Sequence, residues 1–169
     1  YDKYLVNKKK EISDNFNSVI IDFSEASKNK TKEKLIKIIN TKDPTYSILS
    51  LNFIIDNNLI EDQNDVNSLF DIVLNISLDK EIKNLLIYKK ALFNADNLSE
   101  NDLLNILKPL INSESIWQSQ ALYLMAEYLY SNNQKEKSKE FFNKIIILEI
   151  ANQELKIKAQ KRINRDLSE

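Results

Sequence analysis

Apolar side chains recur every three to four positions along almost the whole chain, and we find no convincing strand-like alternation. Because this spacing places side chains on one face of a helix, the pattern predicts an all-α protein of about nine helices. The first is expected from about Leu5 to Ser27 and the second from Thr31 to Asn40. The later apolar stripes contain Phe53, Phe70, Leu86, Leu104, Met125, Phe142 and Ile163.

Several helix boundaries are marked by polar residues and proline. Asp43 followed by Pro44 is a start signal, because Asp caps free amides and Pro is tolerated in a first turn. Ser99, with Asp102 three residues later, forms a variant of the capping box. Pro109 is predicted to end the helix that begins after Ser99.

The turns lack the residue that most often ends a helix, because the chain contains no Gly. Asparagine tolerates the left-handed backbone region better than most residues. Asn57-Asn58, Asn94 and Asn132-Asn133 stand where Gly would be expected. We interpret them as turn residues and not as a binding motif.

The helix lengths and spacings predict a repetitive architecture. Helices joined by turns of a few residues must pack as antiparallel hairpins. The longer helices begin near Pro44, Asp79 and Ser115, a spacing of about 36 residues that is typical of helical repeat arrays. We therefore expect a single domain over residues 1–169, a short α-solenoid of stacked hairpins.

Composition removes most catalytic classes. The chain has no Gly, no Cys and no His, so it lacks the usual phosphate-binding loops, thiol nucleophiles, zinc ligands and imidazole bases. A formal net charge of −1, with both signs interspersed, makes nucleic acid an unexpected partner. We therefore expect no enzymatic activity, no cofactor and no metal.

Between Ala121 and Ile150, large and small apolar residues follow a fixed order on two successive predicted helices. The positions are Met125, Ala126, Leu129, Asn133 in the turn, Ser138, Phe142 and Ile150. This order resembles that of a tetratricopeptide repeat, with Ile150 where the repeat has its closing proline. The resemblance implies a tetratricopeptide-like stack.

A more specific resemblance covers most of the chain. Thr45–Leu51, Leu104–Leu110, Ile116–Ala121 and Leu155–Gln160 are similar to the tetratricopeptide-like family of the ancillary SecYEG translocon subunit. It implies a membrane-proximal helix over 1–30, stacked hairpins over 31–150 and a C-terminal capping helix over 151–169.

The same resemblance implies a place and partners. The chain starts at Tyr1, so an upstream segment, a membrane span, is expected before it. The protein would then be anchored in the bacterial inner membrane, face the periplasm, and bind the Sec translocon and periplasmic folding factors. The alternative is a soluble tetratricopeptide adaptor or an outer-membrane assembly component.

The candidate partner-binding residues lie on the helix after Trp117. Tyr123, Glu127 and Tyr130 are spaced three or four apart and so share one face, which Tyr88 would extend by one repeat. The alternative is that the tyrosine rings pack between neighbouring helices with their hydroxyl groups at the surface. Trp117 is either an exposed anchor or, as we expect, a wedge between adjacent helices.

Two further features have weaker functional meaning. Four acidic residues gather around one predicted turn, but a calcium loop needs a sharp Gly bend that this turn lacks. They are Asp56, Glu61, Asp62 and Asp65. A homodimer through Ile12, Phe16 and Val19 on the first helix is possible, since terminal hairpins often expose apolar edges.

Overall fold

A computed structural model describes the backbone of residues 2–168 and the side chains from Lys3 to Ser168. Over these residues every regular element is helical, which confirms the predicted all-α class and the hairpin arrangement. The chain divides into two compact units, one ending at Leu78 and the other beginning at Asp79. The hydrophobic pattern does not mark this boundary, and a single domain spanning both units stays a prediction.

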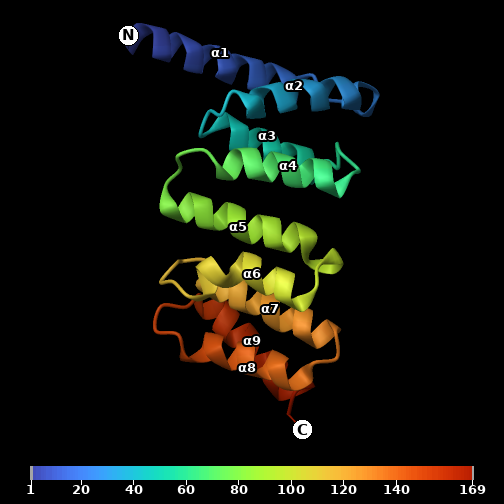
Figure 1. The fold of residues 1–169 in the computed structure, drawn as a ribbon, viewed down its shortest axis with the longest axis vertical. Coiled ribbons are helices and arrows are strands. Elements are labelled where there is room, and N and C mark those ends of the chain that lie inside the picture. Colours follow the sequence, from blue (N-terminus) through green and yellow to red (C-terminus); the bar gives the residue numbers. More distant parts are fainter. Residues whose placement is uncertain (1, 169) are drawn as a thin grey trace. The chain divides into compact units, whose positions relative to one another are not determined.

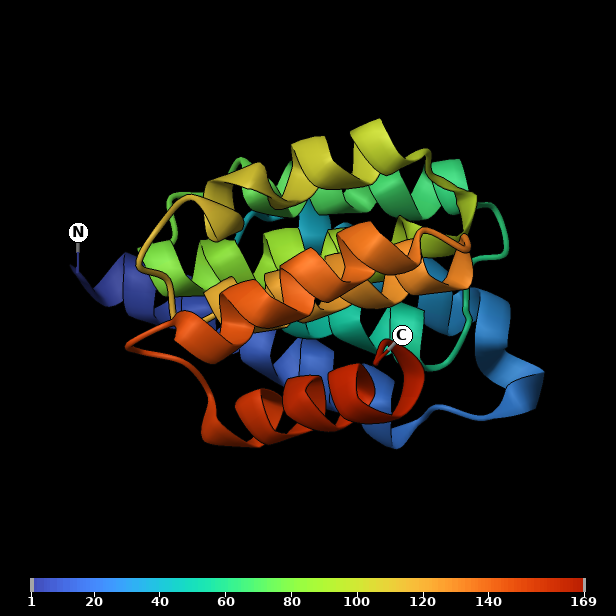
Figure 2. The same ribbon diagram turned by 90° about the horizontal axis from the view of Figure 1, so that it is seen from below.

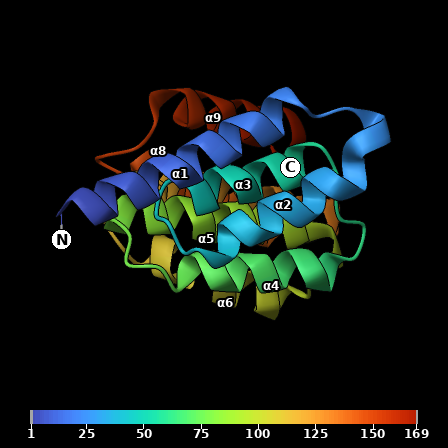
Figure 3. The ribbon, with the colours of Figure 1, turned by 90° about the horizontal axis from the view of Figure 1, so that it is seen from above.

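The first unit contains four α-helices among the described residues, each antiparallel to the one before it (Figures 1 and 3). A 3₁₀ turn, Glu25–Ser27, joins the first two. The α-helices are α1 (Asp2–Ile21), α2 (Lys28–Asn40), α3 (Tyr46–Asp56) and α4 (Gln63–Leu74).

The core of the first unit is built from the apolar faces of α2, α3 and α4. Leu35, Leu51 and Phe70 are fully buried there. Ser47 is also fully buried, and its hydroxyl donates to the Ile39 carbonyl oxygen at 3.1 Å. A small residue at this position lets α2 and α3 approach closely while its polar atom stays paired.

Helix α1 lies across α2 and α3 with only its second half packed. Ile12 and Val19 are buried, and the Phe16 ring lies 5.6 Å from the Tyr46 ring. From Lys3 to Glu11 every side chain is exposed. Figure 3 shows these first turns extending past the ends of α2 and α3. The stripe that predicted a homodimer is therefore largely used within the unit, and the dimer itself stays a prediction.

The second unit contains five α-helices among the described residues. A 3₁₀ turn, Ala95–Asn97, follows the first of them, and Figure 2 shows the last two side by side. They are α5 (Lys80–Asn94), α6 (Glu100–Ile111), α7 (Gln118–Ser131), α8 (Lys135–Ile147) and α9 (Gln153–Asp166).

The packing of α7 on α8 follows the large-and-small pattern read from the sequence. Met125, Ala126 and Leu129 of α7 are buried, as are Ser138 and Phe142 of α8. The Ser138 hydroxyl donates to the Ala126 carbonyl oxygen at 2.8 Å, as Ser47 does in the first unit. Close approach at these small residues leaves the larger side chains to fill the core on either side.

Two predicted helix ends were wrong. The first helix ends at Ile21 and not at Ser27, because Ser24 is extended and its amide donates to the Ser27 hydroxyl at 2.9 Å. Pro109 does not close α6, which continues to Ile111. Proline removes one amide donor, but the helical hydrogen bonds continue after it: the Asn112 amide donates to the Lys108 carbonyl oxygen, four residues earlier, at 3.0 Å.

The asparagine turns were predicted correctly at two of three places. Asn58 and Asn133 have φ of 47° and 60°, and the amide that follows each bonds back to the last turn of its helix. Asn94 has φ of −100°, is buried, and donates its side-chain amide to the Lys90 carbonyl. Lys42, with φ of 57°, is a left-handed residue that the sequence did not reveal.

Candidate partner-binding face of helix α7

The predicted residues Tyr123, Glu127 and Tyr130 do share one face of α7, and all three are half-buried. The Tyr123 ring meets the Phe142 ring of α8 edge-on, with centroids 5.4 Å apart. Burial, and then the neighbouring Glu127 carboxylate, raises the pKa of the Tyr123 phenol above its ordinary value. Tyr123 is therefore a neutral packing group at physiological pH.

Arg162 of α9 occupies the centre of this face. Its Nε and Nη2 atoms donate to the two carboxylate oxygens of Glu127 at 2.8 and 2.9 Å. Its guanidinium carbon lies 4.3 Å from the centroid of the Tyr130 ring. The Arg162 side chain is only 16% exposed and also bonds to Asp166 on its own helix. Glu127 and Tyr130 thus hold a helix of the same chain.

Sequence reasoning missed Arg162. The chain has only two arginines, Arg162 and Arg165. A planar guanidinium can pair bidentately with a carboxylate and stack on an aromatic ring at once, which lysine cannot do. The scarcity of arginine in this chain was therefore the feature of the sequence that could have pointed to Arg162. The role of Tyr123, Glu127 and Tyr130 in binding another protein stays a prediction.

Three glutamates of the second unit each accept a hydrogen bond from a residue that lies about one repeat later in the sequence. Ser115 donates to Glu81 at 2.8 Å, Gln134 to Glu100 at 2.8 Å, and Arg162 to Glu127 as above. The partners are 34, 34 and 35 residues apart. These separations are close to the spacing of helix starts read from the sequence. Each of these contacts joins a helix to the second helix after it, or to the residues just before that helix, and so helps to fix how the two align.

Tyr88 lies on α5 and stacks on the single tryptophan. The rings of Tyr88 and Trp117 are 6.2 Å apart and inclined by 17°. Both pack against the core that contains Leu103 and Ala121, which matches the wedge that we expected for Trp117. Burial raises the pKa of the Tyr88 phenol. Tyr88 and Trp117 thus form one half-buried aromatic pair.

The Tyr88–Trp117 pair gives an optical prediction. Replacing Tyr88 by Ala should lower the free energy of unfolding by about 1–2 kcal/mol, because a stacked neighbour and its buried area are lost. Trp117 emission should shift to longer wavelength, and quenching by acrylamide should increase. Tyr4→Ala, at an exposed position of α1, is the control. Unchanged Trp117 emission in the Tyr88 variant would show that the two rings are not in contact.

The end of α9 has a carboxylate held in its charged form. Arg165 and Arg162 donate to Asp166, and these hydrogen bonds lower its pKa to about 2. An unfolded Asp titrates near 3.9. The stabilisation from Asp166 is therefore fully present above about pH 4 and is lost as pH falls towards 2.

This linkage can be measured with Asp166→Asn. The variant should unfold at a lower temperature than the parent at pH 6, and the difference should narrow steadily between pH 4 and pH 2. Thermal unfolding followed by circular dichroism at each pH gives the comparison. A difference that stayed constant over this range would mean that the arginines do not favour the charged form of Asp166.

The acidic turn before α4 has a structural role. The Asp62 carboxylate accepts from the backbone amides of Asn64 and Asp65 at 2.7 and 3.3 Å, so it caps α4. Among residues 2–168, no three Asp or Glu side chains converge as a metal site would require.

No family model, curated protein or solved structure matches this chain. The resemblance to the ancillary translocon subunit family therefore stays a prediction from the sequence.

Proposed function

We propose that this protein is a non-catalytic scaffold that holds protein partners on the surfaces of its helical hairpins. The observation that carries the proposal is the seating of α9. Ala159 of α9 and Leu167, which follows this helix, are buried against apolar residues of α7 and α8, and Arg162 of α9 pairs with Glu127 of α7. The hairpins of this chain are thus suited to holding a helix by an apolar stripe and one paired charge.

The finer proposal is a periplasmic domain anchored in the bacterial inner membrane, associated with the Sec translocon and periplasmic folding factors. It rests on the sequence resemblance together with the shape of α1. The exposed turns from Lys3 to Glu11 extend away from the first unit, as a helix leading from a membrane would. None of the helices in the described part of the chain is long and apolar enough to cross a bilayer.

The test uses the full-length protein in its native cell. A photo-crosslinking amino acid is placed at Leu5 on the exposed part of α1, at Tyr88, and at Asn105 on the exposed side of α6 as a control. We expect Leu5 adducts with translocon subunits and Tyr88 adducts with folding factors, both recovered from the membrane fraction. Adducts with cytosolic proteins alone would overturn the location and the partners, and equal labelling at Asn105 would overturn specific docking.

A further inference from the structure

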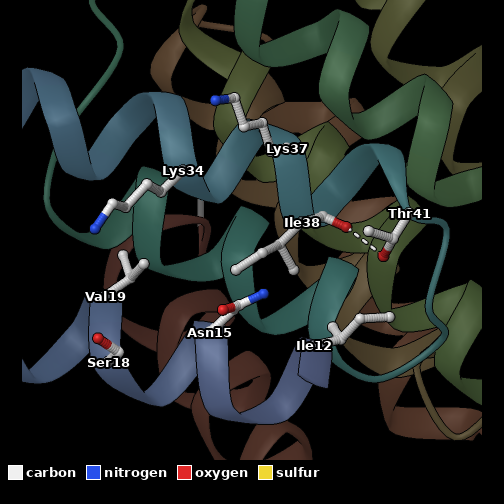
Figure 4. Close-up of a pocket in the computed structure, with 8 residues that line it drawn as sticks. All are labelled: Ile12, Asn15, Ser18, Val19, Lys34, Lys37, Ile38 and Thr41. Atoms are coloured by element: carbon white, nitrogen blue, oxygen red, sulfur yellow. Dashed lines mark hydrogen bonds between the residues drawn. The ribbon is translucent and has the colours of Figure 1, made fainter. Parts of the chain in front are cut away.

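A groove runs between α1 and α2 on the side away from α3 (Figure 4). Its main hollow has a volume of about 290 Å³. A second hollow of about 260 Å³ continues it towards Ser27 and shares Val19 and Lys34 with the first. Along α1 the groove runs over the ten residues from Ile12 to the helix end at Ile21, about 15 Å, and it continues to Asp22. That is the length of about three helical turns.

The floor of the groove is apolar and its sides are polar. Ile12, Val19 and Ile38 are each less than a tenth exposed, and they form the floor. Along α1 the side is lined by Asn15 and Ser18, both exposed. An apolar strip between polar walls is the surface that the apolar stripe of an amphipathic helix matches.

The α2 side of the groove is positively charged. Lys30, Lys34 and Lys37 follow one another at helical spacing and line the two hollows. Within the described part of the chain, none of these three lysines has a carboxylate partner. In Figure 4 the Lys34 side chain reaches across towards α1, whereas Lys37 points away from it. Lys34 is therefore the lysine placed to contact an occupant.

One carboxylate faces these lysines. Asp22 lines the second hollow and accepts a hydrogen bond from the Ser18 hydroxyl at 3.4 Å. Even without Lys37, the ammonium groups of Lys30 and Lys34 outnumber the Asp22 carboxylate, so the groove has a net positive charge. A second copy of the same groove, placed face to face, would bring like charges together. The charge pattern therefore favours a different, acidic partner over a symmetric dimer through Ile12 and Val19.

We propose that the α1–α2 groove docks an acidic amphipathic helix of a partner protein. The apolar stripe of that helix would pack on Ile12, Val19 and Ile38. The carboxylates of the same helix would pair with Lys34 and the lysines next to it on α2. The seating of α9 on α7 and α8 is the same arrangement with the charges reversed, since there the arriving helix brings the cation. This inference rests on the proposed scaffold function and assigns it a surface and a partner chemistry.

The test uses the whole chain and a designed probe. The probe is a fluorescein-labelled amphipathic helix of about 18 residues with a leucine stripe flanked by glutamates. Fluorescence polarisation should show saturable binding that weakens as salt increases. Lys34→Glu should weaken it about tenfold, because one attraction becomes a repulsion. Asn15→Trp, which fills the groove without changing charge, should also weaken it, and Lys83→Glu on α5 should not.

Matched probes separate the other occupants. A probe with lysines in place of the glutamates should not bind, and one with serines in place of the leucines should bind far more weakly. Equal binding to the Lys34→Glu and Lys83→Glu variants, or a protein dimer that only Lys34→Glu dissolves in light scattering, would overturn the inference. In the cell, a crosslinker at Ser18 on the α1 side of the groove should lose its adducts in the Lys34→Glu variant, and adducts there that persist unchanged would reject the acidic occupant and leave the scaffold function standing.

Discussion

Replacing Phe142 by Ala is expected to lower the free energy of unfolding by about 3–5 kcal/mol. The ring is fully buried on α8, where it joins Leu122 and Ala126 of α7 to Ala159 of α9. Deleting it removes the largest apolar surface in this cluster. It also leaves a cavity that the neighbours cannot fill, because Ala126 and Ala159 are too small.

Urea denaturation followed by circular dichroism measures this loss. The neighbouring Phe141→Ala is the matched control, because Phe141 is only half-buried and its ring lies 4.3 Å from the Lys144 ammonium. Phe141→Ala should lower the free energy of unfolding by only about 1–2 kcal/mol. If the two variants were equally destabilised, Phe142 would not be the centre of the packing between α7, α8 and α9.

Replacing Arg162 by Ala should lower the free energy of unfolding by about 2–3 kcal/mol. The change removes the bidentate pair with Glu127, the contact with Asp166 and the stacking on Tyr130. Water reaches Glu127, which is 36% exposed, and this limits the penalty of leaving its carboxylate unpaired. The loss should be localised, with faster amide exchange in α9 than in α7.

Arg165→Ala is the control for charge, since its side chain is 73% exposed and its hydrogen bonds among the described residues go to Asp166. It should lower the free energy of unfolding much less than Arg162→Ala does, because water screens an exposed ion pair. A double-mutant cycle of Arg162→Ala with Glu127→Gln should show a coupling of about 1–2 kcal/mol. Additive losses in that cycle, or an Arg165 variant as unstable as the Arg162 variant, would contradict the assignment of Arg162 as the residue that fixes α9.

The helices and several of their caps could be predicted from local sequence. Ser99 and Asp62 accept hydrogen bonds from amides within their own first turns, so neighbouring residues contain the information. The pairing of Ala126 with Ser138 was predictable for a similar reason, because both lie within one hairpin. Pro109 shows where prediction from local sequence fails. Whether a proline ends a helix depends on the helical hydrogen bonds that form after it, and the residue type alone does not reveal those.

The candidate face was only half predictable. Helical spacing correctly grouped Tyr123, Glu127 and Tyr130, but it could not show that Arg162, 35 residues after Glu127, would occupy that face. The lack of an ion-pair partner for Lys30, Lys34 and Lys37 among the described residues was equally hard to predict. Whether a lysine pairs with a nearby carboxylate depends on how the helices pack, and helical spacing does not state that.

The sequence by itself determined that this protein is built of amphipathic helices paired as antiparallel hairpins, because hydrophobic period, caps and short connections act over a few residues. Tertiary structure alone decided the division after Leu78, the seating of α9 through Arg162, and the groove above Ile12 and Val19. These features arise from contacts between helix faces. Helical spacing identifies the apolar face of each helix, but it does not say which faces pack against each other. Which faces meet is set by side-chain volume and charge across the packed helices.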